Sequence, residues 1–236
     1  MSTHPEKTSA YDALVEAARM LSMNTFWLDL FAENLYWASM EGFLQSSLLG
    51  AFNLGTHGFV ADRERALASR GAFKPDLLVM ERSSGVHEEW WTAREEGGSN
   101  AQARYRRLVQ AVVQLKVAWT PGNARGSAVI TSKAAAVKSD VARLQQCLEN
   151  PSLGIVGVLV SGFHPESDGA EVIRSSLDVI KRAVANEVDS GNEVMLLARA
   201  RPARWSPVLK KGQALFSTLW VTRIRQTVES VQEGLP

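Results

Sequence analysis

An aspartate that follows a proline is the residue of this sequence best placed for metal chemistry. Lys74-Pro75-Asp76 stands directly before the apolar run at residues 77–80, and a short apolar run bounded by turn signals indicates a buried strand. Pro75 fits the first position of a strand, where its missing N–H costs little. Asp76 is therefore expected at the entrance of a strand, where its carboxylate offers the hard oxygen that Mg²⁺ prefers.

Further charged side chains could complete such a site. Glu41 is an acid set within the apolar segment at residues 26–52, and we expect it either on a solvent stripe or beside the metal. Residues 88–95 contain two tryptophans and a threonine, which favour a second strand carrying Glu89 and Arg94. An arginine stays protonated, so Arg94 would hold a phosphate rather than act as a base.

Lys116 offers a second cation. Residues 101–119 are expected to form an amphipathic helix, because apolar positions recur there at spacings of three and four. Lys116 shares a stripe of this helix with Val112 and Trp119. It therefore either supplies its charge to the site or lies along the apolar surface with its ammonium in water.

Two groups of polar residues could contact DNA. Gln114 and Arg107 share a face of the expected helix with Gln110, and this face is either a groove wall or a solvent face. The second group is a basic loop that includes Trp205. Basic residues with an interleaved aromatic suit a phosphate backbone and a stacked base, although a solvated loop explains them equally well. The basic residues of this loop are Arg199, Arg201, Arg204, Lys210 and Lys211.

The order of these pieces resembles that of the PD-(D/E)XK, or restriction-endonuclease-like, nuclease superfamily. A helix with an acid precedes Pro75-Asp76, a second strand follows, and a helix then carries Gln114-Leu115-Lys116-Val117-Ala118-Trp119. The resemblance covers residues 41–119 and implies a mixed β-sheet flanked by helices and Mg²⁺-dependent hydrolysis of DNA. It also implies metal ligands at Glu41 and Asp76, and catalytic roles for Asp76, Glu89, Arg94 and Lys116.

The chain departs from the family pattern on the second strand, where the family carries acid-x-Lys. By position the counterpart is Thr92-Ala93-Arg94, or the pair Glu88-Glu89 with no lysine nearby. Two functions therefore stay open: a metal-dependent nuclease acting on DNA, or a catalytically degenerate relative that serves as a DNA-binding or protein-interaction scaffold. A small α/β enzyme with a different site is a third interpretation.

Composition and charge bound the class of protein. The 236 residues are 45% hydrophobic and 22% charged, which is ordinary for a globular protein, and the net charge of +1 points to no particular partner. Cys147 is the single cysteine, so no internal disulfide can form and a reducing, cytoplasmic setting is expected. No apolar run reaches the roughly 18 residues of a spanning helix, so no membrane association is expected.

The whole chain, residues 1–236, is expected to be one α/β domain with a mixed sheet flanked by helices. Residues 1–10 are expected to be disordered, and residues 11–52 to form an added helical part whose apolar surface packs on the core or on a second subunit. A helix over residues 213–232 closes the chain. The remaining expected strands are at residues 57–60, 127–131, 154–162 and 193–198, and the remaining expected helices at residues 134–148 and 170–188.

Overall fold

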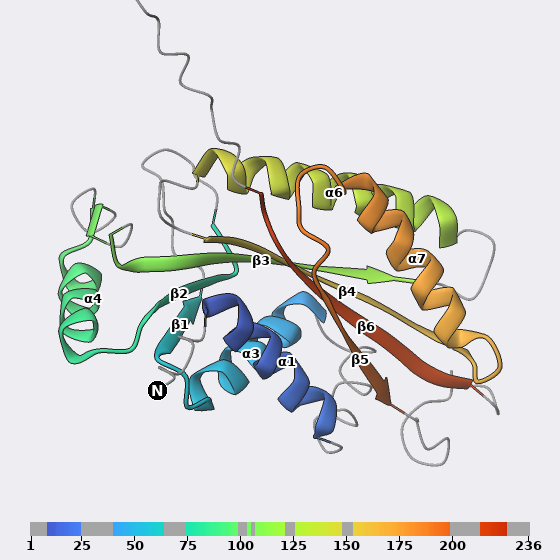
Figure 1. Cartoon of the computed structure of the whole chain (residues 1–236), viewed down its shortest axis with the longest axis horizontal. Helices are drawn as coiled ribbons and strands as arrows, with labels where there is room; N and C mark the ends of the chain where they lie inside the picture. Colours follow the sequence, from blue (N-terminus) through green and yellow to red (C-terminus); the bar gives the residue numbers. More distant parts are fainter. Residues whose placement is uncertain are drawn as a thin grey trace, which may run out of the picture.

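The computed structural model describes residues 9–24, 40–63, 74–98, 103–104, 107–120, 126–147, 153–198 and 213–225. These residues form an α/β fold in which helices flank a six-stranded mixed sheet (Figure 1). The strands are β1 (Phe59–Arg63), β2 (Leu77–Glu81), β3 (Val109–Trp119), β4 (Leu153–Pro165), β5 (Asn192–Ala198) and β6 (Gln213–Arg223). The helices are α1 (Ala10–Met23), α3 (Met40–Leu54), α4 (Ser84–Glu96), α6 (Gly126–Cys147) and α7 (Gly169–Ala183).

The sheet has the strand order β1-β2-β3-β4-β6-β5. β1, β2 and β3 pair antiparallel, β3 and β4 run parallel with α6 between them in the chain, and β6 is antiparallel to both β4 and β5. The strands predicted at residues 77–80 and 154–162 are confirmed as β2 and β4, and both are interior strands. Residues 153–160 of β4 are apolar without interruption because helices cover the strand on both faces.

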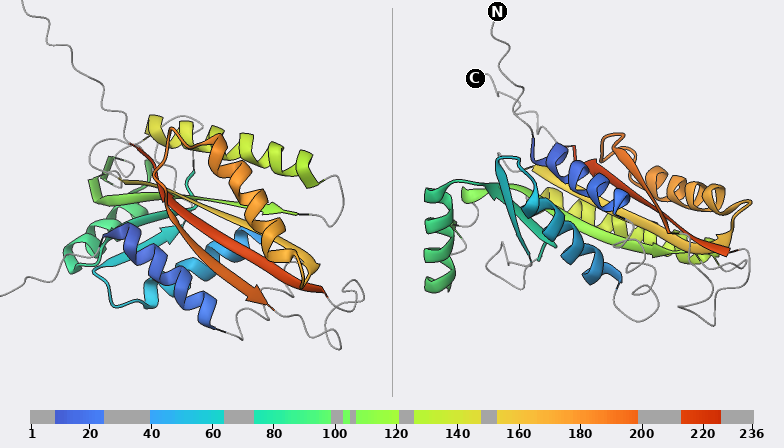
Figure 2. Two further views of the ribbon diagram at one scale, coloured as in Figure 1. Left: turned by 45° about the vertical axis from the view of Figure 1, so that its right-hand side comes forward. Right: turned by 90° about the horizontal axis from the view of Figure 1, so that it is seen from below.

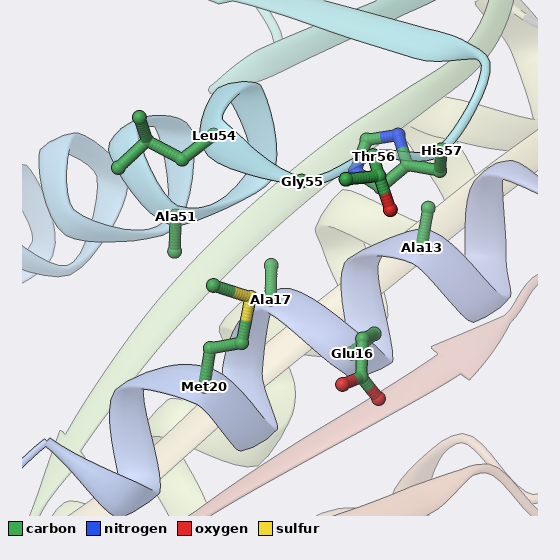
Figure 3. Close-up of a pocket in the computed structure, with 9 residues that line it drawn as sticks. All are labelled: Ala13, Glu16, Ala17, Met20, Ala51, Leu54, Gly55, Thr56 and His57. Carbon is green, nitrogen blue, oxygen red and sulfur yellow. The ribbon is translucent and has the colours of Figure 1, made fainter.

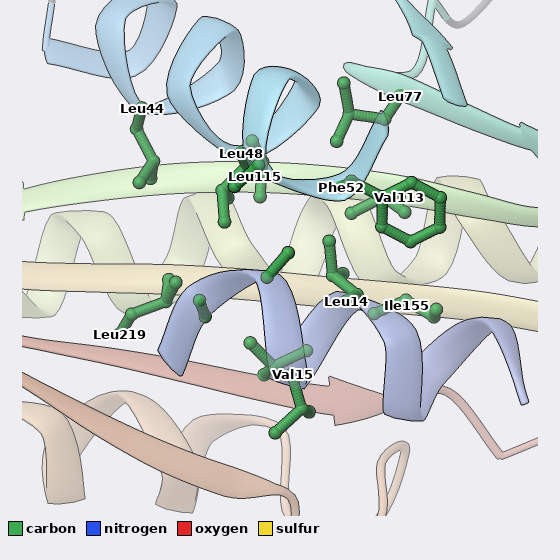
Figure 4. Packing of buried hydrophobic residues seen from close by; sticks show 14 of the residues in the cluster. Leu14, Val15, Leu44, Leu48, Phe52, Leu77, Val113, Leu115, Ile155 and Leu219 are labelled. Carbon is green, nitrogen blue, oxygen red and sulfur yellow. The ribbon is translucent and has the colours of Figure 1, made fainter. Parts of the chain in front are cut away.

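Two pairs of helices sandwich the sheet. α1 and α3 pack on one face and α6 and α7 on the other, as two further views show (Figure 2). On the first face Leu14 of α1 and Leu48 of α3 pack with Leu115 of β3 (Figure 4). The described part of the apolar N-terminal segment is thus buried in the protein's own core, while residues 26–39 lie outside the described residues.

The N-terminal turn of α1 is stabilised by a helix cap and by a hydrogen bond to the sheet. Ser9 and Asp12 form a reciprocal capping box at the N-terminus of α1. The hydroxyl of Tyr11 donates a 2.9 Å hydrogen bond to the backbone carbonyl of Val221 on β6. α1 is therefore docked on the sheet from its first turn. None of the helices in the described ranges is long and apolar enough to cross a bilayer.

Two segments predicted as helices are strands. Residues 109–119 form β3, and the helix predicted at residues 213–232 begins instead as β6. A strand buried on both faces lacks polar alternation, so its continuous apolar run also satisfies the three-and-four spacing of a helix. The period of the pattern therefore could not decide between the two.

Two segments predicted as strands are helical. Residues 88–95 belong to α4, which Ser83 caps by accepting a hydrogen bond from a backbone N–H of the first turn. Residues 127–131 belong to α6, where Ile130 begins a buried stripe that continues at Ala134. In both cases a cap or a longer helical stripe outweighs the strand propensity of a few β-branched or aromatic residues.

Candidate functional site

Asp76, the predicted metal ligand, stands immediately before β2, where β2 and β3 separate. Leu77 and Val113 form the last pair between these strands, and β3 continues beyond it to Trp119. The Oδ2 atom of Asp76 accepts a 2.6 Å hydrogen bond from the backbone N–H of Leu115. This charge-assisted bond fixes the carboxylate against the stretch of β3 that β2 does not cover.

Asp76 and the stretch of β3 that β2 does not cover form what we call the Asp76 opening. Lys116 lies on this stretch, and its side chain contacts helices from both faces of the sheet. Its Nζ lies 3.1 Å from Oδ2 of Asp140 on α6 and 3.4 Å from Oε1 of Glu41 on α3. The exposed fractions of the side chains are 21% for Lys116, 10% for Asp140 and 37% for Glu41. Lys116 lies on a strand and not on the predicted helix, yet it contacts the predicted helix acid Glu41.

The ammonium of Lys116 keeps its proton. Burial alone would lower the pKa of Lys116, but the charges and hydrogen bonds of Asp140 and Glu41 outweigh it and raise that pKa above its ordinary value. At neutral pH the side chain is therefore a fixed cation and hydrogen-bond donor, and it is unable to accept a proton.

α3 is attached to the Asp76 segment one turn beyond Glu41. The Nε2 atom of the buried Gln45 donates a 2.7 Å hydrogen bond to the backbone carbonyl of Asp76. Glu41 and Gln45 are four residues apart, so they share one face of α3. That face borders both Asp76 and Lys116.

Gln114 is an inward-facing residue two positions before Lys116. Strand alternation puts both side chains on the sheet face covered by α6, where Val112 also packs. Gln114 is buried, and its Oε1 atom has no hydrogen-bond partner in the part of the chain that is described. Gln114 therefore lies on neither of the two predicted surfaces, the groove wall or the solvent face, and β3 instead holds its amide oxygen inside the protein, two residues before Lys116.

The oxygen atoms at this opening suit a hard cation. Asp76 and Glu41 offer carboxylates, and Gln114 offers an amide oxygen without a partner among the described side chains. Within the described ranges no three His, Cys, Asp or Glu side chains form a ready-made metal cluster. Mg²⁺ is commonly held by one or two carboxylates and keeps several waters, so the donor types fit this ion.

Glu89, Arg94 and Arg107 lie apart from this opening. α4 follows β2 at the end opposite to Asp76 and stands at the margin of the sheet (Figure 1). Glu89 pairs with Arg107 at 3.8 Å on the surface, and the Arg94 guanidinium lies 4.9 Å from the ring centroid of Trp91. The predicted counterpart of acid-x-Lys at residues 92–94 is therefore wrong, because this segment is helical. Arg199, Arg201, Arg204, Lys210 and Lys211 lie outside the described residues.

A separate hollow lies between α1 and α3. It measures about 420 Å³ and is lined mainly by small and apolar side chains, with Glu16 and His57 as its ionisable residues (Figure 3). Burial and then the charge of Arg82 lower the pKa of His57, so this imidazole is neutral at pH 7. The hollow shares no lining residue with the Asp76 opening and adds no charge pair to it.

Asp140 and Gln45 are site residues that sequence reasoning missed. A signal for Asp140 is visible in retrospect, because it occupies the apolar stripe of α6 between Val137 and Leu144. An acid on a buried stripe needs a partner. Gln45 carries no comparable signal, since a glutamine within a helix is ordinary.

Comparisons with known proteins returned no matching family model, no matching curated protein and no matching solved structure. The arrangement itself has a definite chemistry. A carboxylate at the end of β2 and a buried amide oxygen without a partner among the described residues can hold a hard cation. A fixed ammonium can bind an anionic oxygen such as that of a phosphate.

Proposed function

We propose that this chain has a restriction-endonuclease-like fold and hydrolyses phosphodiester bonds of DNA with Mg²⁺. The observation that carries the proposal is the bond from the backbone N–H of Leu115 to the Asp76 carboxylate, which holds Asp76 beside the residue that precedes Lys116, where β2 and β3 separate. β3, the strand next to Pro75-Asp76, carries Gln114-Leu115-Lys116, which matches acid-x-Lys except for an amide in place of the acid. The order of helix acid, Pro-Asp strand, lysine strand and following helix supports the same family.

Each residue has a role in this proposal. Asp76 and Glu41 would hold the ion, and the Gln114 amide oxygen would add a neutral ligand. When bound, Mg²⁺ supplies a positioned attacking water and neutralises charge on the transferring phosphoryl group. Lys116 is protonated, so it would stabilise anionic phosphate oxygens and would not remove a proton from water.

Asp76→Ala tests the proposal directly. The experiment incubates plasmid and linear DNA with the full chain and Mg²⁺ or Mn²⁺, with melting temperatures as a folding control. We expect wild type to cut and Asp76→Ala to lose cutting while it stays folded, because Asp76 is the carboxylate directly before β2 and its neighbours on that segment, Lys74 and Pro75, cannot replace it. Arg94→Ala is the matched control and should cut like wild type, since Arg94 lies on α4. Equal cutting by wild type and Asp76→Ala would refute the site.

A second candidate function is a non-catalytic scaffold that binds DNA or protein. The amide at Gln114 favours it, as do the two carboxylates that already neutralise Lys116. This candidate predicts that wild type neither cuts DNA nor binds Mg²⁺ by calorimetry. DNA binding would then be independent of divalent ions and unaffected by Asp76→Ala.

A further inference from the structure

Asp140 is a buried acid that depends on Lys116. It lies on the buried stripe of α6, its side chain is only 10% exposed, and its Oδ2 atom is 3.1 Å from Lys116 Nζ. That oxygen has no other hydrogen-bond partner in the described part of the chain. Its Oδ1 atom lies 3.9 Å from the exposed guanidinium of Arg143, which is a loose surface contact. A buried carboxylate is costly unless it is paired, so Lys116 is the partner that keeps Asp140 inside.

Position 114 of β3 carries a neutral residue near the same lysine. Gln114 is buried on the same sheet face, two residues from Lys116, and its Oε1 atom is unpartnered among the residues described. An acid at this position would lie beside Lys116 without any help from α6. The chain has a neutral amide here and places the acid on the helix that covers the same face.

We propose that Asp140 supplies from α6 the carboxylate that position 114 lacks, and so acts as the positioning residue for Lys116. The inference rests on the proposed function, because it assigns the site its missing acid. Glu41 is the weaker holder of the ammonium, since it is more exposed and stands 3.4 Å away. Asp140 is therefore the group that fixes where the cation points.

The net charge around Lys116 makes it possible to test whether an acid at position 114 can replace Asp140. Lys116, Glu41 and Asp140 sum to one negative charge, because one cation faces two carboxylates. Gln114→Glu in wild type would add a third carboxylate and should destabilise the protein. The same substitution together with Asp140→Asn restores the original charge and should stabilise. The effect of Gln114→Glu is thus expected to reverse its sign with the residue type at position 140.

The experiment measures melting temperatures of the full chain without divalent ions for wild type, both single variants and the double variant. We expect Asp140→Asn to lower the melting temperature by about 4 °C, and the double variant to recover most of that loss. In the cutting assay Asp140→Asn should lose about tenfold or more in kcat with little change in KM, because a mispositioned cation mainly affects the transition state. The double variant should regain most of that rate.

Glu187→Gln is the matched control. It removes the 3.7 Å ion pair between Glu187 and Lys138. Lys138 also lies on α6, but this ion pair does not include Lys116. Gln114→Glu should not rescue it. If Gln114→Glu changes the melting temperature equally in the Asp140 and Asp140→Asn backgrounds, the exchange is refuted, even when Asp76→Ala abolishes cutting. If the sign reverses although wild type cuts no DNA, Asp140 still positions Lys116 and the nuclease proposal alone fails.

Discussion

The two ends of β2 both gather charged side chains, but they differ in how many elements converge. At the Asp76 end, β3 contributes Lys116, α3 contributes Glu41 and α6 contributes Asp140, and these side chains are at least partly buried. At the other end, α4 and the segment before β3 form surface pairs such as Glu89 with Arg107. Exposed pairs of this kind contribute about 0–1 kcal/mol.

Side chains that come together from several elements therefore identify a site better than local charge density does. α4 has more charged residues than the Asp76 opening, yet its pairs need no particular geometry and are screened by water. At the opening, carboxylates from two helices hold the Lys116 ammonium, and the backbone of β3 holds the Asp76 carboxylate. Chemistry that depends on precise side-chain positions is therefore expected at the Asp76 opening and not at α4.

Removing the central cation should have the largest effect on stability. Lys116→Met leaves Glu41 and Asp140 without their shared partner, and breaking a buried pair in this way costs about 3 kcal/mol or more. Urea denaturation at pH 7 measures the change in the free energy of unfolding. Arg107→Met is the matched control on the α4 side and should change it by less than about 0.5 kcal/mol. Similar losses in the two variants would abolish the contrast between the two ends.

The pH dependence of stability should show the same contrast more weakly. Asp140 and Glu41 raise the pKa of Lys116 in the folded protein despite its burial. The stability from this raised pKa is fully present below the unfolded value of 10.5 and is lost as pH rises through the folded value. The difference in unfolding free energy between wild type and Lys116→Met should therefore be constant from pH 7 to pH 10 and shrink above it. A difference that stays constant to pH 12 would contradict the role of the ammonium.

The sequence predicted the parts of the fold that depend on local signals. β2 and β4 are short apolar runs between turn residues, and Asp76 could be placed before β2 because Pro75 marks its start. The metal-ligand role of Glu41 stays a prediction, and its contact with Lys116 was not predicted, because Lys116 was expected on a helix and lies on β3.

The rest could not be predicted, because tertiary neighbours decide it. Apolar side chains line β3 on both faces, and only the pairing with β2 and β4 makes that run a strand. Because residues 109–119 were expected to form a helix, the counterpart of acid-x-Lys was predicted at residues 88–95, and the strand position of Gln114 and Lys116 was not anticipated. Asp140 was missed for the same reason, since its partner is 24 positions away on another element.

The smallest expected effect is that of a substitution at Arg94. It tests whether the α4 end of β2 takes no part in the chemistry. Its guanidinium is exposed and contacts the Trp91 ring 4.9 Å away, an interaction worth about 0.5–1 kcal/mol at an exposed site. Arg94→Ala should therefore lower the free energy of unfolding by less than about 1 kcal/mol and leave DNA cutting and DNA affinity unchanged. Fluorescence anisotropy with labelled DNA and the plasmid assay measure these quantities, and Glu89→Gln is a second variant on the same helix. A loss of cutting in Arg94→Ala as large as in Asp76→Ala would show that the α4 end takes part in the chemistry.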